Sequence, residues 1–105
     1  MEQLAKMNKQ ELEEKLAEGK YVLFFTADWC PDCRFIKPAM PEIGEEFSDF
    51  NFIQVDRDEN IDLCQELDVY GIPSFIVYED GKEVDRFVNK DRKTKKEVEN
   101  FLKAI

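Results

Sequence analysis

The chain alternates between short, almost continuously hydrophobic runs and segments in which hydrophobic residues recur every three or four positions. The continuous runs predict strands that are covered on both faces, over residues 21–26, 50–55 and 74–78. A weaker strand is expected over residues 3–6, with Leu4 pointing inward. The dipeptide Asp80-Gly81 is typical of a tight hairpin turn and leads into a fifth strand over residues 82–88.

Four segments between or after these strands predict helices. Asn8 can cap the first helix, because a glutamate follows three residues later as in a capping box. A longer helix is expected over residues 31–47, where Pro38 and Pro41 should kink or divide it. A short helix is expected over residues 61–67. The last helix is amphipathic, with hydrophobic residues spaced i, i+3, i+4 and i+7 at Val98, Phe101, Leu102 and Ile105.

The predicted order of elements is therefore β-α-β-α-β-α-β-β-α. Parallel crossovers followed by an antiparallel hairpin give an α/β fold, with a mixed central sheet flanked by helices on both faces. The chain has 105 residues and contains no repeat or linker-like stretch. We therefore expect residues 1–105 to form a single domain.

The charge balance of the chain argues against several classes of partner. The 15 basic and 24 acidic residues give a net charge of −9, which repels phosphate backbones and anionic lipid, so we expect neither nucleic acid nor membrane as a partner. No apolar run approaches the roughly 20 residues that a membrane helix needs. The first twenty residues also lack the continuous apolar stretch of a signal peptide. We therefore expect a cytoplasmic monomer.

The sequence contains no histidine and three cysteines. The absence of histidine removes Ser–His and Cys–His catalysis and imidazole metal ligation from the possible chemistry. An odd and small number of cysteines does not predict a structural disulfide framework. The remaining candidate groups are thiols, carboxylates and lysines.

Cys30 and Cys33 form a Cys-x-x-Cys pair directly after the predicted central strand, on the first turn of the next helix. Two cysteines at this spacing can close a small disulfide with little backbone motion. The N–H groups and dipole of the helix N-terminus favour a Cys30 thiolate, the species that attacks disulfides. Cys33, one turn further on, should be more buried and act second. A zinc site is the alternative, but zinc usually takes four ligands and the chain offers only Cys64 besides. We expect no metal.

Two segments of the chain, Trp-Cys-Pro-Asp-Cys at residues 29–33 and Gly-Ile-Pro-Ser at residues 71–74, resemble the thioredoxin superfamily. The similarity covers essentially the whole chain. It implies a thioredoxin fold in which Cys30 is the attacking nucleophile and Cys33 the resolving thiol. It also implies a cis peptide bond before Pro73, facing the two sulfurs. The substrate contacts that it implies are Trp29, Pro31, Ile72 and Pro73.

The chain departs from the usual pattern of that superfamily in three places, one of which covers two residues. Pro31-Asp32 stands in place of Gly-Pro, as in a subset of thioredoxin-like proteins. Phe24 stands where thioredoxins carry a buried aspartate thought to help deprotonate the resolving thiol, and Asn89 where a glycine lines the groove. We hypothesise that Asp32 is a proton relay for Cys33, in place of the missing carboxylate. The alternative is a solvated carboxylate that complements the helix dipole.

The function that the resemblance implies is thiol–disulfide exchange, in which the protein reduces disulfides in proteins or small molecules and maintains cell redox homeostasis. This exchange needs no bound cofactor. The implied electron donor is a separate reductase, such as an NADPH-dependent thioredoxin reductase. Two other functions stay open, a non-catalytic thioredoxin-like adaptor and a disulfide oxidase or isomerase.

Other residues near the expected site have simpler interpretations. Cys64 lies at i±3 spacing from Ile61 and Leu67, which favours buried packing over a regulatory thiol. Tyr70 flanks the docking edge and is either a partner contact or ordinary surface. A basic cluster before the last helix predicts a solvated face rather than a docking site, and consists of Lys90, Arg92, Lys93, Lys95 and Lys96.

Overall fold

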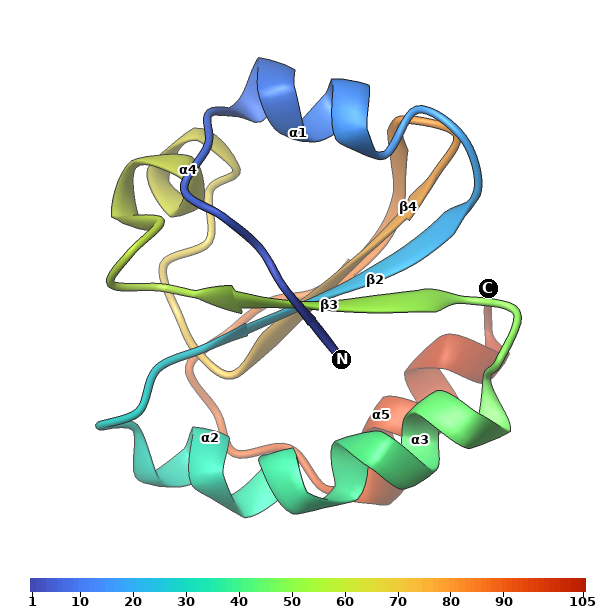
Figure 1. Cartoon of the computed structure of the whole chain (residues 1–105). Helices are drawn as coiled ribbons and strands as arrows, with labels where there is room; N and C mark the ends of the chain where they lie inside the picture. The colour runs from blue at the N-terminus through green and yellow to red at the C-terminus, as the bar shows by residue number, and fades with distance from the viewer.

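Five strands form one twisted sheet in the computed structural model, which describes residues 1–105 (Figure 1). The spatial order is β1-β3-β2-β4-β5. The first three strands in this order run parallel, and β4 and β5 are antiparallel to their neighbours. The strands are β1 (Glu2–Gln3), β2 (Lys20–Thr26), β3 (Asn51–Asp56), β4 (Ser74–Glu79) and β5 (Lys82–Phe87). The predicted mixed sheet and the predicted order of the strands along the chain are confirmed.

Helices cover both faces of this sheet (Figure 1). One face carries α1 (Lys9–Lys15) and α4 (Ile61–Glu66), and the other carries α2 (Pro31–Ile36), α3 (Met40–Glu46) and α5 (Lys95–Lys103). No helix is both long enough and apolar enough to cross a membrane.

The helix predicted over residues 31–47 is divided, as its two prolines indicated. A short 3-10 turn, Lys37–Ala39, lies between α2 and α3. Pro38 lies in this turn and Pro41 in the first turn of α3. Proline is tolerated in a first turn because the N–H that it lacks has no partner there.

The central strand β2 is buried on both faces. Leu23 and Phe25 pack toward α1 and α4, whereas Val22 and Phe24 pack toward α2, α3 and α5. The ring of Phe24 stacks on that of Phe75 in β4, with centroids 5.1 Å apart. Each such side chain contributes about 1.5–3 kcal/mol when it is fully buried. This packing fixes the position of the end of β2, from which the chain enters α2.

The local signals for the first helix and the hairpin are confirmed. Asn8 Oδ1 accepts from Glu11 N at 2.8 Å, and Glu11 Oε1 accepts from Asn8 N at 3.0 Å. Asp80 and Gly81 have φ values of 51° and 82°, which is the left-handed geometry of the expected turn.

The first strand is shorter and lies earlier than predicted, because it covers Glu2–Gln3 rather than residues 3–6. Leu4 is buried as expected, and its N–H donates to Gln54 O at 2.9 Å. Beyond it, Met7 N donates to Asn60 Oδ1 at 3.1 Å. The chain therefore leaves the sheet edge for α1 before a longer strand can form.

We expect replacement of Phe24 by alanine to lower the free energy of unfolding by about 3–5 kcal/mol, because the change leaves a cavity beside Phe75. Urea denaturation of both proteins measures the difference. The control Phe24→Leu keeps most of the apolar volume and should cost about 1 kcal/mol. A loss below 1 kcal/mol for Phe24→Ala would contradict the packing described for β2.

Cys64 should make the fold sensitive to alkaline pH. The thiol is buried between α4 and the sheet, and burial raises its pKa from 9.0 to about 11. Because the folded-state value is the higher one, the stabilising contribution is complete below pH 9 and is lost as the pH rises to 11.

Between pH 9 and 11, the free energy of unfolding should therefore fall by about 2 kcal/mol less in the Cys64→Ala protein than in the wild type. Urea denaturation at fixed pH, with a phosphine reductant present, measures the two slopes. Parallel slopes for the two proteins would contradict the burial of this thiol.

Candidate active site

The two paired cysteines lie at the N-terminus of α2, directly beyond the end of β2. Cys30 is the N-cap residue of α2, and its Sγ accepts from Cys33 N at 3.2 Å. Both cysteines are free thiols. Cys30 is 5% exposed and Cys33 is 1% exposed, which confirms the expectation that Cys33 is the more buried of the two. The cap directs a backbone N–H dipole at Cys30 Sγ, which favours negative charge on that sulfur.

Cys33 is held as a neutral thiol. Burial is the largest cause that raises the pKa of Cys33 to about 11, and a hydrogen bond with Cys30 acts in the same direction. Hydrogen bonds with the Thr26 side chain and the Ala27 backbone act in the opposite direction. Cys33 therefore has to lose a proton before its sulfur can act as a nucleophile.

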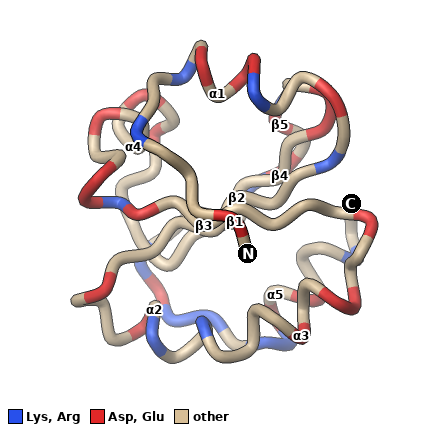
Figure 2. Tube along the Cα trace, in the orientation of Figure 1, with Lys and Arg blue, Asp and Glu red and all other residues tan.

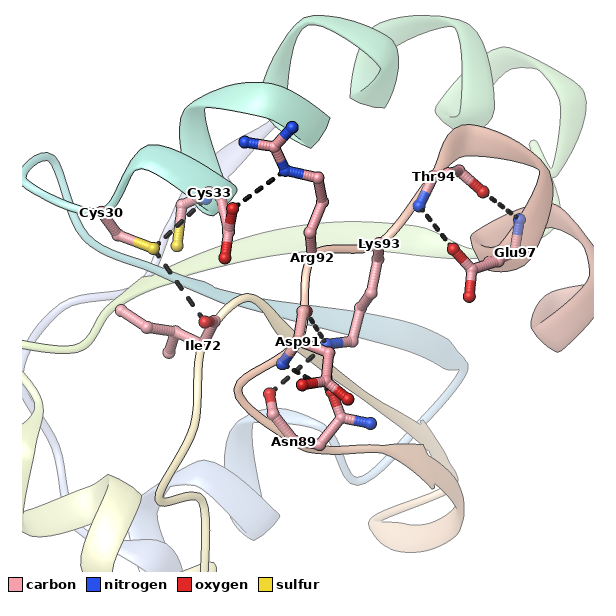
Figure 3. A network of polar contacts seen from close by, with 10 residues as sticks. Cys30, Cys33, Ile72, Asn89, Asp91, Arg92, Lys93, Thr94 and Glu97 are labelled. Atoms are coloured by element: carbon pink, nitrogen blue, oxygen red, sulfur yellow. Dashed lines mark hydrogen bonds and ion pairs between the residues drawn. The ribbon is translucent and has the colours of Figure 1, made fainter.

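The segment from Gly71 to Ser74 faces the cysteines from the other side (Figure 3). The Ile72-Pro73 peptide bond is cis, as the resemblance implied. The Cys30 thiol donates to Ile72 O, with a distance of 4.0 Å between the sulfur and the oxygen. Ile72 and Pro73 are both buried against the site. The structure thus brings together Cys30, Cys33 and the cis-proline segment.

Trp29 extends from the loop that precedes Cys30, and its side chain is 56% exposed. Its indole Nε1 donates to Asp58 Oδ2 at 2.8 Å, and the Arg57 guanidinium lies 5.8 Å from the centre of its ring. The sequence analysis did not identify Asp58. The sequence did contain a signal for it. Strands β2 and β3 are parallel, so both end at the same edge of the sheet, and charged residues directly follow β3.

Asp32 forms an ion pair across the site with Arg92, which precedes α5. The Arg92 Nε lies 2.9 Å from Asp32 Oδ1 (Figure 3). The Arg92 guanidinium also lies over the ring of Phe35, 4.3 Å from its centroid. Arg92 was expected on a solvated face, and that prediction is wrong in part: the side chain is half-exposed but is bound to the Cys-x-x-Cys turn.

The prediction of a solvated face is wrong for Lys93, which is 1% exposed. Its ammonium donates to Asn89 Oδ1 and Asp91 O, each at 2.8 Å, and to Asn89 O at 3.3 Å. The ammonium also lies 5.0 Å from the centre of the Phe87 ring. Burial lowers the pKa of Lys93. The three acceptors match the three N–H bonds of the ammonium, which is why the charge is tolerated there.

Asn89 connects this loop to the cis-proline segment. The Ser74 hydroxyl donates to Gly71 O at 2.6 Å and lies 3.2 Å from Asn89 O. A Cβ atom on Gly71 would lie 2.5 Å from the backbone of Asn89 and of Lys90, so only glycine fits. A shallow pocket of about 310 Å³ opens beside this contact, lined by Asp68, Tyr70, Gly71, Val88, Asn89 and Lys90.

The site carries charges of both signs. Figure 2 shows basic residues in the loop before α5, and α2 holds one acidic and one basic residue, Asp32 and Arg34. No group of three or more His, Cys, Asp or Glu side chains is arranged to hold a metal ion. The local chemistry is thus that of two thiols beside a carboxylate and two basic side chains.

The family model for thioredoxin matches residues 3–104. Thioredoxin-2 of Pyricularia oryzae is 38% identical over 82 residues, which are 77% of this chain and 48% of that protein. Thioredoxin H2 of Arabidopsis thaliana is 38% identical over 86 residues, 80% of this chain and 65% of that protein. The chain spans about half to two-thirds of the length of these curated relatives.

Solved structures agree with the fold. The X-ray structure of Fasciola hepatica thioredoxin has a TM-score of 0.82 and 30% identity, over 99% of this chain and 98% of that one. Oxidised mitochondrial thioredoxin 3 from Saccharomyces cerevisiae has a TM-score of 0.83 and 24% identity, over 100% of this chain and 95% of that one. The shared sheet, the cis-proline segment and the family match over nearly the whole length lead to one conclusion: this chain belongs to the thioredoxin family.

Proposed function

We propose that the protein is a thiol–disulfide oxidoreductase that reduces disulfides in proteins or small molecules. The observation that carries the proposal is the geometry of the pair, with Cys30 Sγ at the helix cap and Cys33 buried one turn behind it. A reactive thiol in front of a second thiol is what two-step disulfide exchange requires. Residues 1–105 would act as one catalytic unit, because every residue of the site comes from one sheet and the helices that pack on it.

In the first step the Cys30 thiolate attacks one sulfur of the substrate disulfide. A bond forms between that sulfur and Cys30, the substrate S–S bond breaks, and the second substrate sulfur leaves as a thiolate that takes a proton from water. Cys33 then loses its proton and attacks Cys30 Sγ. The mixed disulfide breaks and the remaining substrate sulfur leaves as a thiolate that takes a proton from water. The substrate then has two thiols, and Cys30 and Cys33 are joined as a disulfide.

Asp32 is the proposed proton relay for the second step. The Cys33 thiol has a pKa raised to about 11 by burial, so its deprotonation at neutral pH needs a base. The Phe24 side chain cannot accept a proton. It is fully buried, on the face of the sheet opposite to α1. Asp32 is the neighbour of Cys33 in the chain and keeps a half-buried carboxylate in the same turn. The proton passes to this carboxylate directly or through water.

The substrate would dock against an apolar rim formed by Trp29, Pro31, Ile72 and Pro73. Trp29 is half-exposed and fixed by Asp58, so it can cover a bound segment without losing much side-chain freedom. Ile72 O points to the Cys30 thiol, which places the cis-proline segment within reach of a chain bonded to that sulfur. Tyr70, 73% exposed beside the shallow pocket, extends the same rim.

The oxidised protein would be returned to its dithiol form by a separate reductase, such as an NADPH-dependent thioredoxin reductase. Free thiols that cycle in this way suit a reducing compartment, and we propose the cytoplasm. Relatives of the chain include thioredoxins named as mitochondrial and as chloroplastic. The protein would act as a monomer, since one chain supplies the whole site.

Cysteine variants test the proposed steps in an insulin-reduction assay with dithiothreitol. Cys30→Ser should reduce the rate to that of dithiothreitol alone, because no attacking thiolate remains. Cys33→Ser, mixed with insulin in the absence of dithiothreitol, should still attack once and accumulate a mixed disulfide, visible by mass spectrometry. The control Cys64→Ala should keep the full rate, since that thiol is buried away from the site. Catalysis by Cys30→Ser would overturn the proposed function, and an adaptor would show no catalysis with any variant.

The relay is tested by Asp32→Asn, which keeps the size of the side chain and removes its basicity. Release of substrate from the Cys30 mixed disulfide should slow by up to about 100-fold between pH 6 and 8, the lower end of the effect of a positioned base. Stopped-flow release of a fluorescent thiol measures this step. The matched control is Asp28→Asn, an exposed carboxylate on the other side of Trp29. Equal release rates for wild type and Asp32→Asn would exclude the relay.

A further inference from the structure

The carboxylate of Asp32 creates an electrostatic problem for the attacking sulfur. Asp32 lies between the two cysteines, in the first turn of α2, two residues after the N-cap Cys30. The helix N-terminus favours negative charge on Cys30 Sγ. A second negative charge in the same turn acts against it, because neighbouring like charges disfavour each other's ionised forms. Something has to offset the carboxylate if Cys30 is to react as a thiolate at neutral pH.

Arg92 is the group placed to do so. Its Nε lies 2.9 Å from Asp32 Oδ1, and no other basic side chain lies within ion-pair distance of that carboxylate. The pair joins residues that are 60 positions apart in the chain. It therefore bridges the two walls of the site, α2 and the loop before α5, as Figure 3 shows.

Two further contacts hold Arg92 in this position. Its guanidinium lies over the Phe35 ring, 4.3 Å from the centroid, which restrains a long side chain that would otherwise be free. The backbone on either side is fixed, because the buried Lys93 ammonium binds Asn89 and Asp91, and Asn89 Oδ1 accepts from Asp91 N at 3.0 Å. A preorganised cation loses little freedom when it forms its ion pair.

On the basis of the proposed function, we infer that Arg92 is a positioning residue for the attack step. By pairing with Asp32 it offsets the negative charge in the turn that carries Cys30, and so increases the reactivity of Cys30 Sγ as a nucleophile. The other titratable or charged groups on the elements that meet here lie on α2, in the loop before α5 and around Trp29. They are Cys33 and Arg34, then Lys90, Asp91 and Lys93, then Asp28, Arg57 and Asp58. Arg92 itself transfers neither a proton nor an electron.

The experiment measures the alkylation of Cys30 by iodoacetamide, in a background that carries Cys33→Ser and Cys64→Ala so that only one thiol reacts. Arg92→Gln should slow alkylation at pH 7 by about two- to fivefold, the effect expected for a half-exposed ion pair. An electrostatic role for Arg92 predicts that the two rates converge at pH 10. A purely structural role for Arg92 would slow the reaction equally at both pH values.

A double-mutant cycle with Asp32→Asn assigns the effect to the ion pair. Asp32→Asn alone should accelerate alkylation at pH 7, and the slowing by Arg92→Gln should be smaller in that background, because the cation is no longer held at the turn. Arg92→Lys should restore part of the rate, because it keeps the charge but loses the planar fork. In 1 M salt the difference between wild type and Arg92→Gln should shrink, since a half-exposed pair is screened. The matched control is Lys90→Gln, an exposed cation of the same loop, which should leave the rate unchanged.

Three results would overturn the inference: an unchanged rate for Arg92→Gln at pH 7, an equal loss in the Asp32→Asn background, or an equal loss with Lys90→Gln. None of these bears on the proposed function, because alkylation is measured without turnover. The proposed function fails separately if the wild-type protein does not accelerate insulin reduction. A protein that reduces insulin while Arg92→Gln is alkylated at the wild-type rate would keep its function and lose the role assigned to Arg92.

Discussion

The burial of β2 on both of its faces is the constraint on which the rest of the structure depends. Its side chains alternate between two hydrophobic layers, one closed by α1 and α4 and the other by α2, α3 and α5. A strand packed in this way cannot shift by one residue without exchanging its two sets of side chains between layers. The end of β2 is therefore fixed in space, and with it the helix N-terminus that carries Cys30. The position of Cys30 Sγ is therefore set by the packing of the hydrophobic side chains of β2.

The paired charges of the site lie at its surface. Phe24, stacked on Phe75, leaves no ionisable group at the position where related proteins are expected to carry a buried aspartate. The ionisable groups instead lie in the Cys-x-x-Cys turn and in the loop before α5, where Asp32 meets Arg92. Solvent and salt screen charges in such exposed places, whereas they screen a buried carboxylate much less. Such a site should respond to ionic strength and to the charge of its partner.

The sequence was most informative where one local pattern determines the outcome. Continuous apolar runs predicted the strands, and Asp80-Gly81 predicted the hairpin. Contacts between distant residues left no local pattern, so the pairing of Asp32 with a residue 60 positions away could not be predicted. The prediction that Lys93 lies on a solvated face was wrong because it rested only on the charge of the residue. It directly precedes Thr94, which caps α5 in a capping box with Glu97, and the residue before such a cap usually faces inward.

Gly71 shows how closely the parts of this site are joined. Its α-carbon faces the backbone of Asn89 and Lys90 with no room for even one methyl group. On one side of this contact the chain continues to Pro73, and on the other to Arg92. A displacement of the cis-proline segment is therefore transmitted to the loop before α5 through direct backbone contact, rather than through side chains that could change conformation. Under the roles proposed for these residues, a partner bound at the cis-proline segment would therefore also displace the loop that carries Arg92.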